Sequence, residues 1–533
     1  MFLATSSHCE SLKGIDDFVQ KHLRTNKDVL KTLKEPIKTK FFIGLDLSSQ
    51  SDQIGVWHNS YDFNYQRILS PFGKKLIEYA QQVSRNYGYD PDRTLVNGIS
   101  PEKGVVWRNY LPEIIRTDGE MAILAGIPAI SFITVNDARG CIDTPCDTFS
   151  RINTNNIEKQ LTVLKGVIER VLSDPDFFLV PDLNIQDKMA RLVCHVVTFN
   201  PRKSFVPSEP VKGAVVLPRY QYFYNVSNGP MCAYQKTYLG VRGDLIEMTN
   251  NNGEAAISRI PLSISFLLQA YGFDQNSGKI TLASDFGING DEQYPNRVGL
   301  DTYDKKWMLV LFECKPINLI GLVDPQYLIP ASKLDVFDLS NSLPEAYSYF
   351  LETYDAPQWK WSSYSEPVGV VFARPHTVIK IAGESGPLGI RSLLLNNKET
   401  ITNKEVAEGA GFDVDAVDAI DNVSYQAARD MINLDSYRTY NFKKYNIRNE
   451  RLDALETQSK ELLQTAESAK KEKDWWGFLK FSRQAQAIES RAYPDVKSTA
   501  NDVVKGVIFY FMLLLPFAYF GERLFMGFPK LEK

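Results

Sequence analysis

An apolar segment near the end of the chain, residues 503–520, constrains the fold most, because its only charged side chain is Lys505. At about 18 residues it is long enough to cross a lipid bilayer as a helix, and residues 524–528 extend it. Tyr510 and Tyr519 suit positions at the two membrane–water interfaces. A soluble helix that is apolar on every face would have to be buried on every side. The sequence therefore predicts a transmembrane helix over residues 503–528, with the lipid bilayer as a partner.

Length and charge narrow the class of protein further. A chain of 533 residues is too long for one ordinary domain, so three or four units are expected. The net charge of −4 gives no reason to expect nucleic-acid binding. No HExxH, P-loop or GxSxG motif is present, and five histidines give a hydrolytic zinc site little imidazole to draw on.

Both ends of the sequence look like cuts within a longer protein. Residues 1–5 read as a core strand without a leader, and the chain stops soon after its hydrophobic helix. The alternative is a short protein with an unusual start.

Residues 1–200 alternate between strand and helix patterns, which predicts an α/β fold with a largely parallel sheet. Residues 41–46 form a short apolar run that ends in a carboxylate, as buried parallel strands do. Apolar residues between 157 and 171 recur at three-to-four spacing, which predicts an amphipathic helix. The other expected elements are a helix over 12–23, a helix over 71–87 with Pro71 at its start, and a strand over 127–135.

The rest of the chain reads as β units followed by helices. A proline-rich linker over 201–212 leads into short β runs over 213–290, with a turn at 249–257 that feeds a strand. A second β unit is expected over 300–397. Residues 421–495 predict a helical stalk whose last two helices form a hairpin, interrupted by Pro494. The fold class expected is therefore multidomain: an α/β domain, β-sandwich units, a helical hairpin stalk and a C-terminal transmembrane helix.

Three short motifs between residues 117 and 149 carry a family resemblance: Thr117-Asp118-Gly119-Glu120, Ala125-Gly126-Ile127-Pro128-Ala129 and Asp143-Thr144-Pro145-Cys146-Asp147-Thr148. Together they resemble the last third of a two-zinc aminopeptidase domain, the type found in bacterial leucyl aminopeptidases and glutamate carboxypeptidases. That family has Ser-Asp-His, a Gly-Ile-Pro-Ala strand and His-Thr-Pro-x-Asp-Thr, whose first His binds zinc. The resemblance covers about residues 1–175 and implies an N-terminally truncated aminopeptidase-like domain over 1–200.

The resemblance also implies which residues stand at the family's catalytic positions. The family holds two zinc ions on five ligands and uses a glutamate as general base. Here His8 falls at the position of the base, Cys9 and Asp46 fall at ligand positions, and Asp143 replaces the late histidine. The early His-x-Asp motif would lie upstream of the chain. Gly119 stands where the family has the histidine of Ser-Asp-His.

These changes imply a degenerate site that needs no cofactor, or zinc if the site works. A repurposed single-metal site of His8 or Cys9 with Asp46 and Asp143 is the alternative.

Each of these residues also has a structural interpretation. Asp46 fits a hydrogen-bonded carboxylate at the end of a strand, and Asp143 and Asp147 fit turn and cap positions. Cys141 and Cys146 are close enough in sequence to bridge or to share a metal, although two free buried thiols are the commoner outcome.

Other acidic and imidazole side chains are expected to be structural. Glu10 and Glu120 read as surface carboxylates. His58, His195 and His376 lie in strand-like surroundings.

The expected function is that of a membrane-anchored protein, with its large N-terminal region outside the cytoplasm and a peptidase-like domain that is no longer an enzyme. Residues 213–290 resemble the β-sandwich domain that accompanies carboxypeptidases. The succession of soluble region, helical stalk and membrane helix resembles part of an FtsX-like permease, which implies membrane-protein partners and a role in binding or transport. Two alternatives stay open. One is an active membrane-bound zinc metallopeptidase of the aminopeptidase type whose first ligands lie upstream. The other is an adhesion or scaffold module without a transport role.

Overall fold

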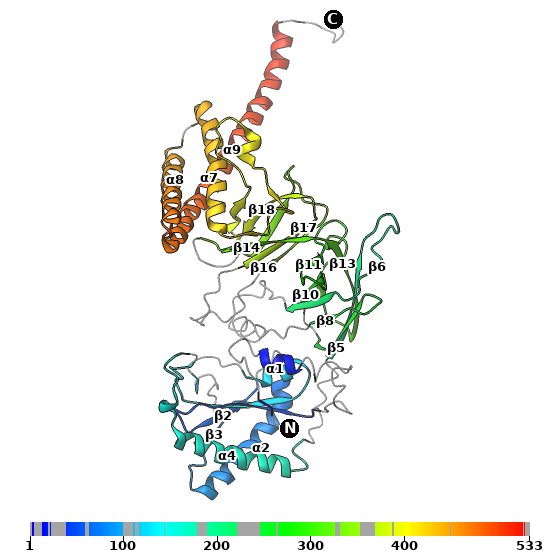
Figure 1. Cartoon of the computed structure of the whole chain (residues 1–533), viewed down its shortest axis with the longest axis vertical. Coiled ribbons are helices and arrows are strands. Elements are labelled where there is room, and N and C mark those ends of the chain that lie inside the picture. Colours follow the sequence, from blue (N-terminus) through cyan, green and yellow to red (C-terminus); the bar gives the residue numbers. More distant parts are fainter. Residues whose placement is uncertain are drawn as a thin grey trace. The chain divides into compact units, whose positions relative to one another are not determined.

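The computed structural model describes residues 3–4, 13–19, 22, 39–58, 63–99, 110–111, 117–142, 144–178, 189–220, 246–262, 265–325, 331–351, 368–385, 388–447, 449–525 and 527. The chain forms two compact units. Unit 1 holds residues 1–279, 289–311 and 355–361, and unit 2 holds residues 280–288, 312–354 and 362–533. Figure 1 shows the elements of both units. The predicted multidomain chain, with several sheets, several helices and a long apolar C-terminal helix, is confirmed.

Unit 1 begins with a four-stranded sheet. Its strand order is β1-β4-β2-β3, with bounds Phe42–Asp46, Ala129–Thr134, Ile54–Trp57 and Leu95–Asn97. The β1/β4 and β2/β3 pairs are parallel, whereas β2 and β4 are antiparallel. Every residue of β4 is buried, as expected of a central strand that is covered on both faces. The strands predicted over 41–46 and 127–135 are therefore present.

Two long helices lie along one face of this sheet (Figure 1). They are α2 (Phe63–Tyr87) and α4 (Thr154–Ser173). Leu69 and Phe72 of α2 share a buried cluster with Val163 of α4. The apolar spacing that predicted the second helix thus marks the stripe that α4 buries.

The predicted start of α2 is wrong, because Pro71 lies inside the helix and not at its first turn. Proline lacks an N–H group and removes one intrahelical hydrogen bond. Leu69, before the proline, and Phe72, after it, are both fully buried in the same cluster. Packing of this continuous apolar stripe outweighs the one lost bond, so the helix runs through the proline.

Two shorter helices, α1 (Lys13–Phe18) and α3 (Gly119–Leu124), contribute to a separate buried cluster. Of the core strand predicted over residues 1–5, only Leu3 and Ala4 are described. Neither lies in a strand, and both are exposed. At these two positions the prediction is wrong.

The second part of unit 1 is built on β-strands. β5 pairs in parallel with β13 and antiparallel with β9 and β6. β10 pairs antiparallel with β7 and β12, and β7 pairs antiparallel with β8. The bounds are Met189–Thr198 (β5), Glu209–Pro210 (β6), Val215–Tyr220 (β7), Glu247–Met248 (β8), Glu254–Pro261 (β9), Ser265–Phe273 (β10), Arg297–Gly299 (β12) and Asp304–Glu313 (β13).

The turn predicted at 249–257 is present and depends on one glycine. Gly253 has φ +73°, and a Cβ there would lie 2.6 Å from the carbonyl oxygen of Val196. Asn250 Oδ1 accepts hydrogen bonds from the backbone N–H groups of Asn252 (2.9 Å) and Glu254 (3.0 Å). The side chain of Asn250 thus orders the turn, and the chain then enters β9.

Unit 2 contains two four-stranded sheets. One has the order β16-β17-β14-β21, and the other has the order β15-β18-β19 with β20 on β18. Leu319 and Val371 of the first sheet share a buried cluster with Val336 and Ile381 of the second, so the two sheets enclose a common core, as in a β-sandwich. The bounds are Lys315–Ile320 (β14), Lys333–Phe337 (β15), Tyr347–Leu351 (β16), Val368–Ala373 (β17), Val378–Glu384 (β18), Ile390–Leu394 (β19), Phe412–Asp413 (β20) and Ala419–Ile420 (β21).

Three helices end the described chain: α7 (Val423–Lys444), α8 (Glu450–Lys471) and α9 (Trp475–Phe525). Asparagine side chains cap the N-termini of the first two, because Asn422 accepts from Tyr425 N and Asn449 from Leu452 N. The helices pack on one another through small residues, such as Ala428 and Ala485 in one buried cluster. The predicted helical hairpin is therefore confirmed in α8 and α9. Short elements elsewhere are η3 (Phe149–Arg151), β11 (Ile280–Ser284) and α6 (Lys404–Glu408).

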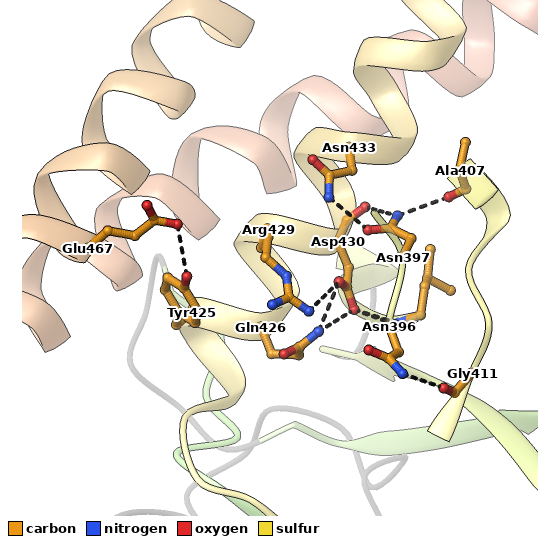
Figure 2. A network of polar contacts seen from close by, with 11 residues as sticks. Asn396, Asn397, Ala407, Gly411, Tyr425, Gln426, Arg429, Asp430, Asn433 and Glu467 are labelled. Atoms are coloured by element: carbon orange, nitrogen blue, oxygen red, sulfur yellow. Dashed lines mark hydrogen bonds and ion pairs between the residues drawn. The ribbon is translucent and has the colours of Figure 1, made fainter. Parts of the chain in front are cut away.

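A buried aspartate fastens α7 to the loop after β19 (Figure 2). Asp430 is fully buried, and its Oδ2 accepts from the backbone N–H groups of Leu395 (2.7 Å) and Asn396 (2.8 Å). Gln426 Nε2 donates to both carboxylate oxygens at 2.9 Å. In the first turn of α7, Tyr425 donates to Glu467 of α8 at 3.0 Å. The first helix of the bundle is thus bonded both to the β-unit and to its helical neighbour.

The helix α9 is continuous through Pro494, where the sequence predicted an interruption. A proline at this position cannot donate to the carbonyl oxygen of Ser490, one turn earlier. Arg391 of β19 supplies the missing donor, with its Nη1 at 3.0 Å from that oxygen. The same guanidinium lies 3.5 Å from Asp324 Oδ2, which is buried. A cation from the sheet therefore completes the hydrogen bonding that the proline removes.

This repair predicts coupling between Arg391 and Pro494. Arg391→Met should lower the stability of the bundle, because the Ser490 carbonyl loses a charged donor worth about 1.5–3 kcal/mol. In a Pro494→Ala background the new backbone N–H satisfies that carbonyl, so the same change should be milder by about 1–2 kcal/mol. Amide hydrogen exchange along α9 in the four proteins of this double-mutant cycle measures the difference. Equal losses in both backgrounds would show that Arg391 acts only through Asp324.

Candidate functional site

The candidate site lies where β1 and β4 end. Because these strands are parallel, with Phe42 opposite Ala129 and Asp46 opposite Ile133, their carboxyl ends meet at one edge of the sheet. In open α/β sheets, ligands bind outside the carboxyl ends of the strands. The loops after Asp46 and Thr134 form this edge.

An ion pair occupies the edge. Arg139 Nη1 donates to Asp46 Oδ1 at 2.8 Å, and its Nη2 donates to the backbone oxygen of Asp46 at 3.1 Å. The side chains are 5% exposed for Arg139 and 18% for Asp46. Two donors from one planar guanidinium fix both the carboxylate and the backbone at the end of β1. The negative charge of Asp46 is thus neutralised by a cation from its own chain.

Asp137 holds Arg139 in place. Arg139 has φ +48°, a left-handed conformation that is unusual for a long side chain. Its N–H donates to Asp137 Oδ1 at 2.8 Å, and the N–H of Gln50 donates to Oδ2 at 3.1 Å. Burial alone would raise the pKa of Asp137, but hydrogen bonding to its carboxylate, including these two N–H groups, lowers the pKa below its usual value. The carboxylate therefore joins the loop after β1 to the loop after β4.

The helix α4 contacts the loop after β1 through the side chain of Gln160, which is fully buried. Its Nε2 donates to the backbone oxygens of Ser48 (2.9 Å) and Ser51 (2.5 Å), and its Oε1 accepts from Thr134 Oγ1 at 3.0 Å. A glutamine on the apolar stripe of α4 thus satisfies the backbone of the loop after β1.

The structure separates the predicted site residues into two groups. His8, Cys9 and Asp143 lie outside the described residues. Asp46 is described, and it contacts Arg139. Within the described ranges, no group of three or more histidine, cysteine, aspartate or glutamate side chains is arranged to hold a metal ion. A guanidinium therefore lies against the carboxylate at the one described ligand position.

Two neighbouring acidic residues have structural roles. Glu120 is buried, contrary to the expectation of a surface carboxylate, and its Oε1 accepts from the N–H of Thr117 at 3.1 Å at the start of α3. It is therefore a capping residue, of the kind that reaches back from the first turn of a helix. Asp147 is exposed in a turn, with its N–H donating to the Thr144 oxygen at 3.1 Å, as its turn interpretation predicted.

The histidines differ in their surroundings. His58 is half-buried, and burial of its imidazole lowers its pKa to about 4, which agrees with a structural role. His195 lies in β5, 3.4 Å from Glu254 on the paired strand β9. His376, expected in strand-like surroundings, instead lies in the turn between β17 and β18 with φ +61°. Its Nδ1 is 2.6 Å from Asp415 Oδ2.

Sequence reasoning missed Arg139, the central residue of the edge. The predicted site contained only possible metal ligands, which are carboxylates, thiols and imidazoles. It did not include a basic side chain that could take the place of the metal ion. A signal was present, because Arg139 lies between the end of the strand over 127–135 and Asp143, at the edge where Asp46 was expected.

A second set of buried titratable groups lies in the helical bundle. Asp435 of α7 and Glu489 of α9 are almost fully buried. Burial raises the pKa of Asp435 to about 7, against the opposing charge of Arg438, whose Nη1 is 3.3 Å away. Burial and the charge of Asp435 raise the pKa of Glu489 well above its usual value. The two carboxyl groups therefore favour their protonated forms.

Glu456 of α8 completes this cluster and behaves differently. Burial opposes its ionisation, but Lys460 Nζ donates to its Oε1 at 2.7 Å and Thr439 Oγ1 donates to its Oε2 at 2.9 Å. These contacts keep the pKa of Glu456 below its usual value. Among these five side chains, two cations, Arg438 and Lys460, thus face three carboxyl groups.

Comparisons with known proteins give no family assignment. No protein-family model and no curated protein matches the chain. Among solved structures, shaft pilin SpaA of Lactobacillus rhamnosus GG matches 37% of this chain and 88% of its own, at 8% identity and a TM-score of 0.13. An aspartate-to-asparagine mutant of that pilin gives a TM-score of 0.16. Similarity at this level is too low to indicate a shared fold.

The buried carboxyl groups predict that the bundle weakens as pH rises. The folded pKa values of Asp435, about 7, and of Glu489 lie above the unfolded values, near 4, so their contribution is complete below about pH 4; that of Asp435 is lost as pH rises through about 7. The opening free energy of α9, from amide hydrogen exchange, should fall by about 2–3 kcal/mol between pH 5 and pH 8 from Asp435 alone.

Glu489→Gln should flatten this dependence, because it removes one of the two groups. Glu456→Gln is the matched control, since the pKa of Glu456 is lowered and its stabilisation is lost on acidification. An unchanged slope in Glu489→Gln would refute the assignment.

Proposed function

We propose that this protein is a membrane-anchored, extracytoplasmic binding or coupling protein whose α/β domain is aminopeptidase-like but hydrolytically inactive. The α/β domain would bind a partner or transmit a conformational change to it, and the C-terminal helix would anchor the protein in the bilayer. A membrane transporter complex of the FtsX-like permease kind is the partner that this arrangement suits best.

The observation that carries the inactive domain is the pairing of Asp46 with Arg139. A zinc ligand must offer a deprotonated oxygen to the metal. Here a buried guanidinium lies 2.8 Å from that oxygen and cannot be deprotonated in a protein. The guanidinium of Arg139 is a permanent cation that neutralises Asp46, as zinc neutralises this ligand in the family. Unlike zinc, it does not bind and activate a water molecule.

The membrane anchor is supported by the exposure of the second half of α9. The helix has 51 residues, and its most apolar window, with a mean hydropathy of 1.9, has no buried share. Phe509, Leu514 and Phe520 are each more than half exposed. Residues 503–525 extend about 35 Å as a helix, enough for the roughly 30 Å hydrocarbon core. A bilayer would remove this surface from water, which is the main driving force for insertion.

The coupling role is supported by the continuity of α9. Its N-terminal half packs in the bundle, with Ala485 and Val496 buried, and the same helix continues into the apolar half. Because no loop separates the halves, a displacement of the bundle reaches the membrane segment directly. This is the property that a permease-associated extracytoplasmic region needs.

The inactive domain predicts a null result in a peptidase assay. The protein expressed from its complete reading frame, purified in detergent and supplied with zinc, should hydrolyse leucine p-nitroanilide no faster than buffer. It should also retain no tightly bound zinc by elemental analysis. A two-zinc leucyl aminopeptidase in the same detergent serves as the positive control.

The alternative function, a membrane-bound zinc aminopeptidase whose first ligands lie upstream, gives the opposite result. Its hydrolysis would be sensitive to chelators and would be lost in Asp46→Asn and in His8→Ala. Arg139→Ala separates the two explanations further. An active enzyme that uses Asp46 as a ligand should bind zinc more tightly without the guanidinium, whereas a protein without the other ligands should stay inactive.

The anchor predicts resistance to alkaline extraction. The wild-type protein should remain with membranes in carbonate. Leu513→Arg combined with Leu514→Arg, at the middle of the span, should release it, because each central arginine costs about 2.5–3.5 kcal/mol of insertion. Val503→Arg is the matched control, because an arginine at the end of the span can reach the interface. Extraction of the wild-type protein would contradict membrane spanning.

A further inference from the structure

Two cysteines lie side by side in the segment that follows Arg139. Cys141 and Cys146 are both free thiols, and Cys146 is exposed, so the expectation of buried thiols is wrong for this pair. Their Sγ atoms are 2.7 Å apart in a sulfur–sulfur hydrogen bond. A small side-chain rotation is enough to bring them to the length of a disulfide bond, about 2.05 Å.

The backbone between the cysteines holds them together. The N–H of Thr144 donates to the oxygen of Cys141 at 3.2 Å, and Thr144 Oγ1 donates to the same oxygen at 2.8 Å. That hydroxyl also lies 2.8 Å from Cys146 Sγ. Thr144 therefore closes a turn whose two ends carry the thiols.

A cation and the hydroxyl adjust the reactivity of the two sulfurs. Arg151 Nη1 donates to Cys141 Sγ at 3.1 Å. Contacts with Cys141 and Thr144 lower the pKa of Cys146, and the contact with Cys146 raises the pKa of Cys141. Cys146 is also the more exposed of the two sulfurs, so it is the more accessible to an external disulfide. An accessible thiolate with an adjacent thiol is the arrangement of a reactive dithiol.

We infer that Cys141 and Cys146 form a reversible dithiol–disulfide site that exchanges with low-molecular-weight disulfides such as oxidised glutathione. The Cys146 thiolate attacks one sulfur of the glutathione disulfide, forms a mixed disulfide and releases one glutathione thiolate. Cys141 loses its proton to solvent and attacks the Cys146 sulfur, and the second glutathione thiolate leaves. Both thiolates take up protons, so two protein thiols and one glutathione disulfide give one protein disulfide and two glutathione thiols.

The site adjoins the edge that holds Asp46. Arg139 precedes Cys141 by two residues, and the backbone oxygen of Arg151 accepts from Gln50 Nε2 at 2.8 Å. A bond between the sulfurs ties together the segment between these two arginines. Oxidation would therefore restrain the loop beside the Asp46–Arg139 pair, whatever that edge binds.

The chain contains internal controls for this chemistry. Cys194 and Cys314 are buried, and burial raises the pKa of each thiol to about 12. Both should react more slowly than Cys146, by a factor on the order of a hundred or more. Cys9 and Cys232 lie outside the described residues, so the measurement must assign each cysteine separately.

The test uses the full chain in detergent. The reduced protein is incubated with oxidised glutathione at pH 8, quenched with N-ethylmaleimide and digested with trypsin. The peptide over residues 140–151 contains both cysteines and should be recovered lighter by two hydrogen atoms and unlabelled. Reduction with dithiothreitol should return two labelled thiols, while Cys194 and Cys314 stay reduced throughout. A 140–151 peptide that keeps two thiols, carries two separate glutathiones or bonds to Cys9 or Cys232 would overturn the inference.

Variants in which one of the two cysteines is replaced distinguish the attacking sulfur from the resolving sulfur. With Cys141→Ser, Cys146 should accumulate a mixed disulfide with glutathione, because no neighbouring thiol resolves it. With Cys146→Ser, the remaining Cys141 should react with oxidised glutathione at least about tenfold more slowly than Cys146 does in Cys141→Ser. Equal rates in the two variants would remove Cys146 as the attacking sulfur.

Discussion

The contacts of the Arg391 guanidinium connect β19 with the long helix α9 in unit 2. The guanidinium lies between a buried aspartate, Asp324, and the carbonyl of Ser490 that Pro494 leaves without an intrahelical donor. Without this donor, the carbonyl of Ser490 would have no hydrogen-bond partner. Helices usually kink at a proline that leaves a carbonyl in this way. The donor comes from β19, so a strand of the sheet satisfies the carbonyl that the proline leaves unbonded. Arg391 and the buried Asp430 thus both join the β-unit to the helical bundle.

Much of the fold could be predicted from apolar spacing, and two of the errors in helix bounds came from prolines. The stripe of α4 and the buried run of β4 were readable because burial on one face or on both leaves a period in the sequence. Pro71 and Pro494 were read as a helix start and a break, yet both lie inside helices. Their local penalty is offset by long-range partners: a buried apolar stripe around Pro71 and Arg391 beside Pro494. Partners that are a hundred residues away in sequence leave no local signal.

The candidate site shows a similar division. Sequence reasoning placed Asp46 at a strand end, and the parallel pairing of β1 and β4 puts it at the edge where ligands bind. The residue that decides its chemistry, Arg139, was not considered, because a resemblance draws attention to the positions that a family uses. His8, Cys9 and Asp143 remain predictions. A fixed guanidinium balances charge as a metal does, but it offers no open coordination position.

The uninterrupted α9 has a geometric consequence. Consecutive residues of an α-helix are rotated by about 100°, so the faces of the bundle half and of the apolar half share one angular phase. The face of the helix that contacts α8 is fixed by packing. The direction of every side chain in the apolar half then follows from its number of residues beyond that contact. One extra residue near Ser498 would turn the apolar half by more than a quarter of a circle and lengthen the helix by only about 1.5 Å. In this chain, the direction in which each side chain of the apolar half points is therefore set by the packing of the bundle half.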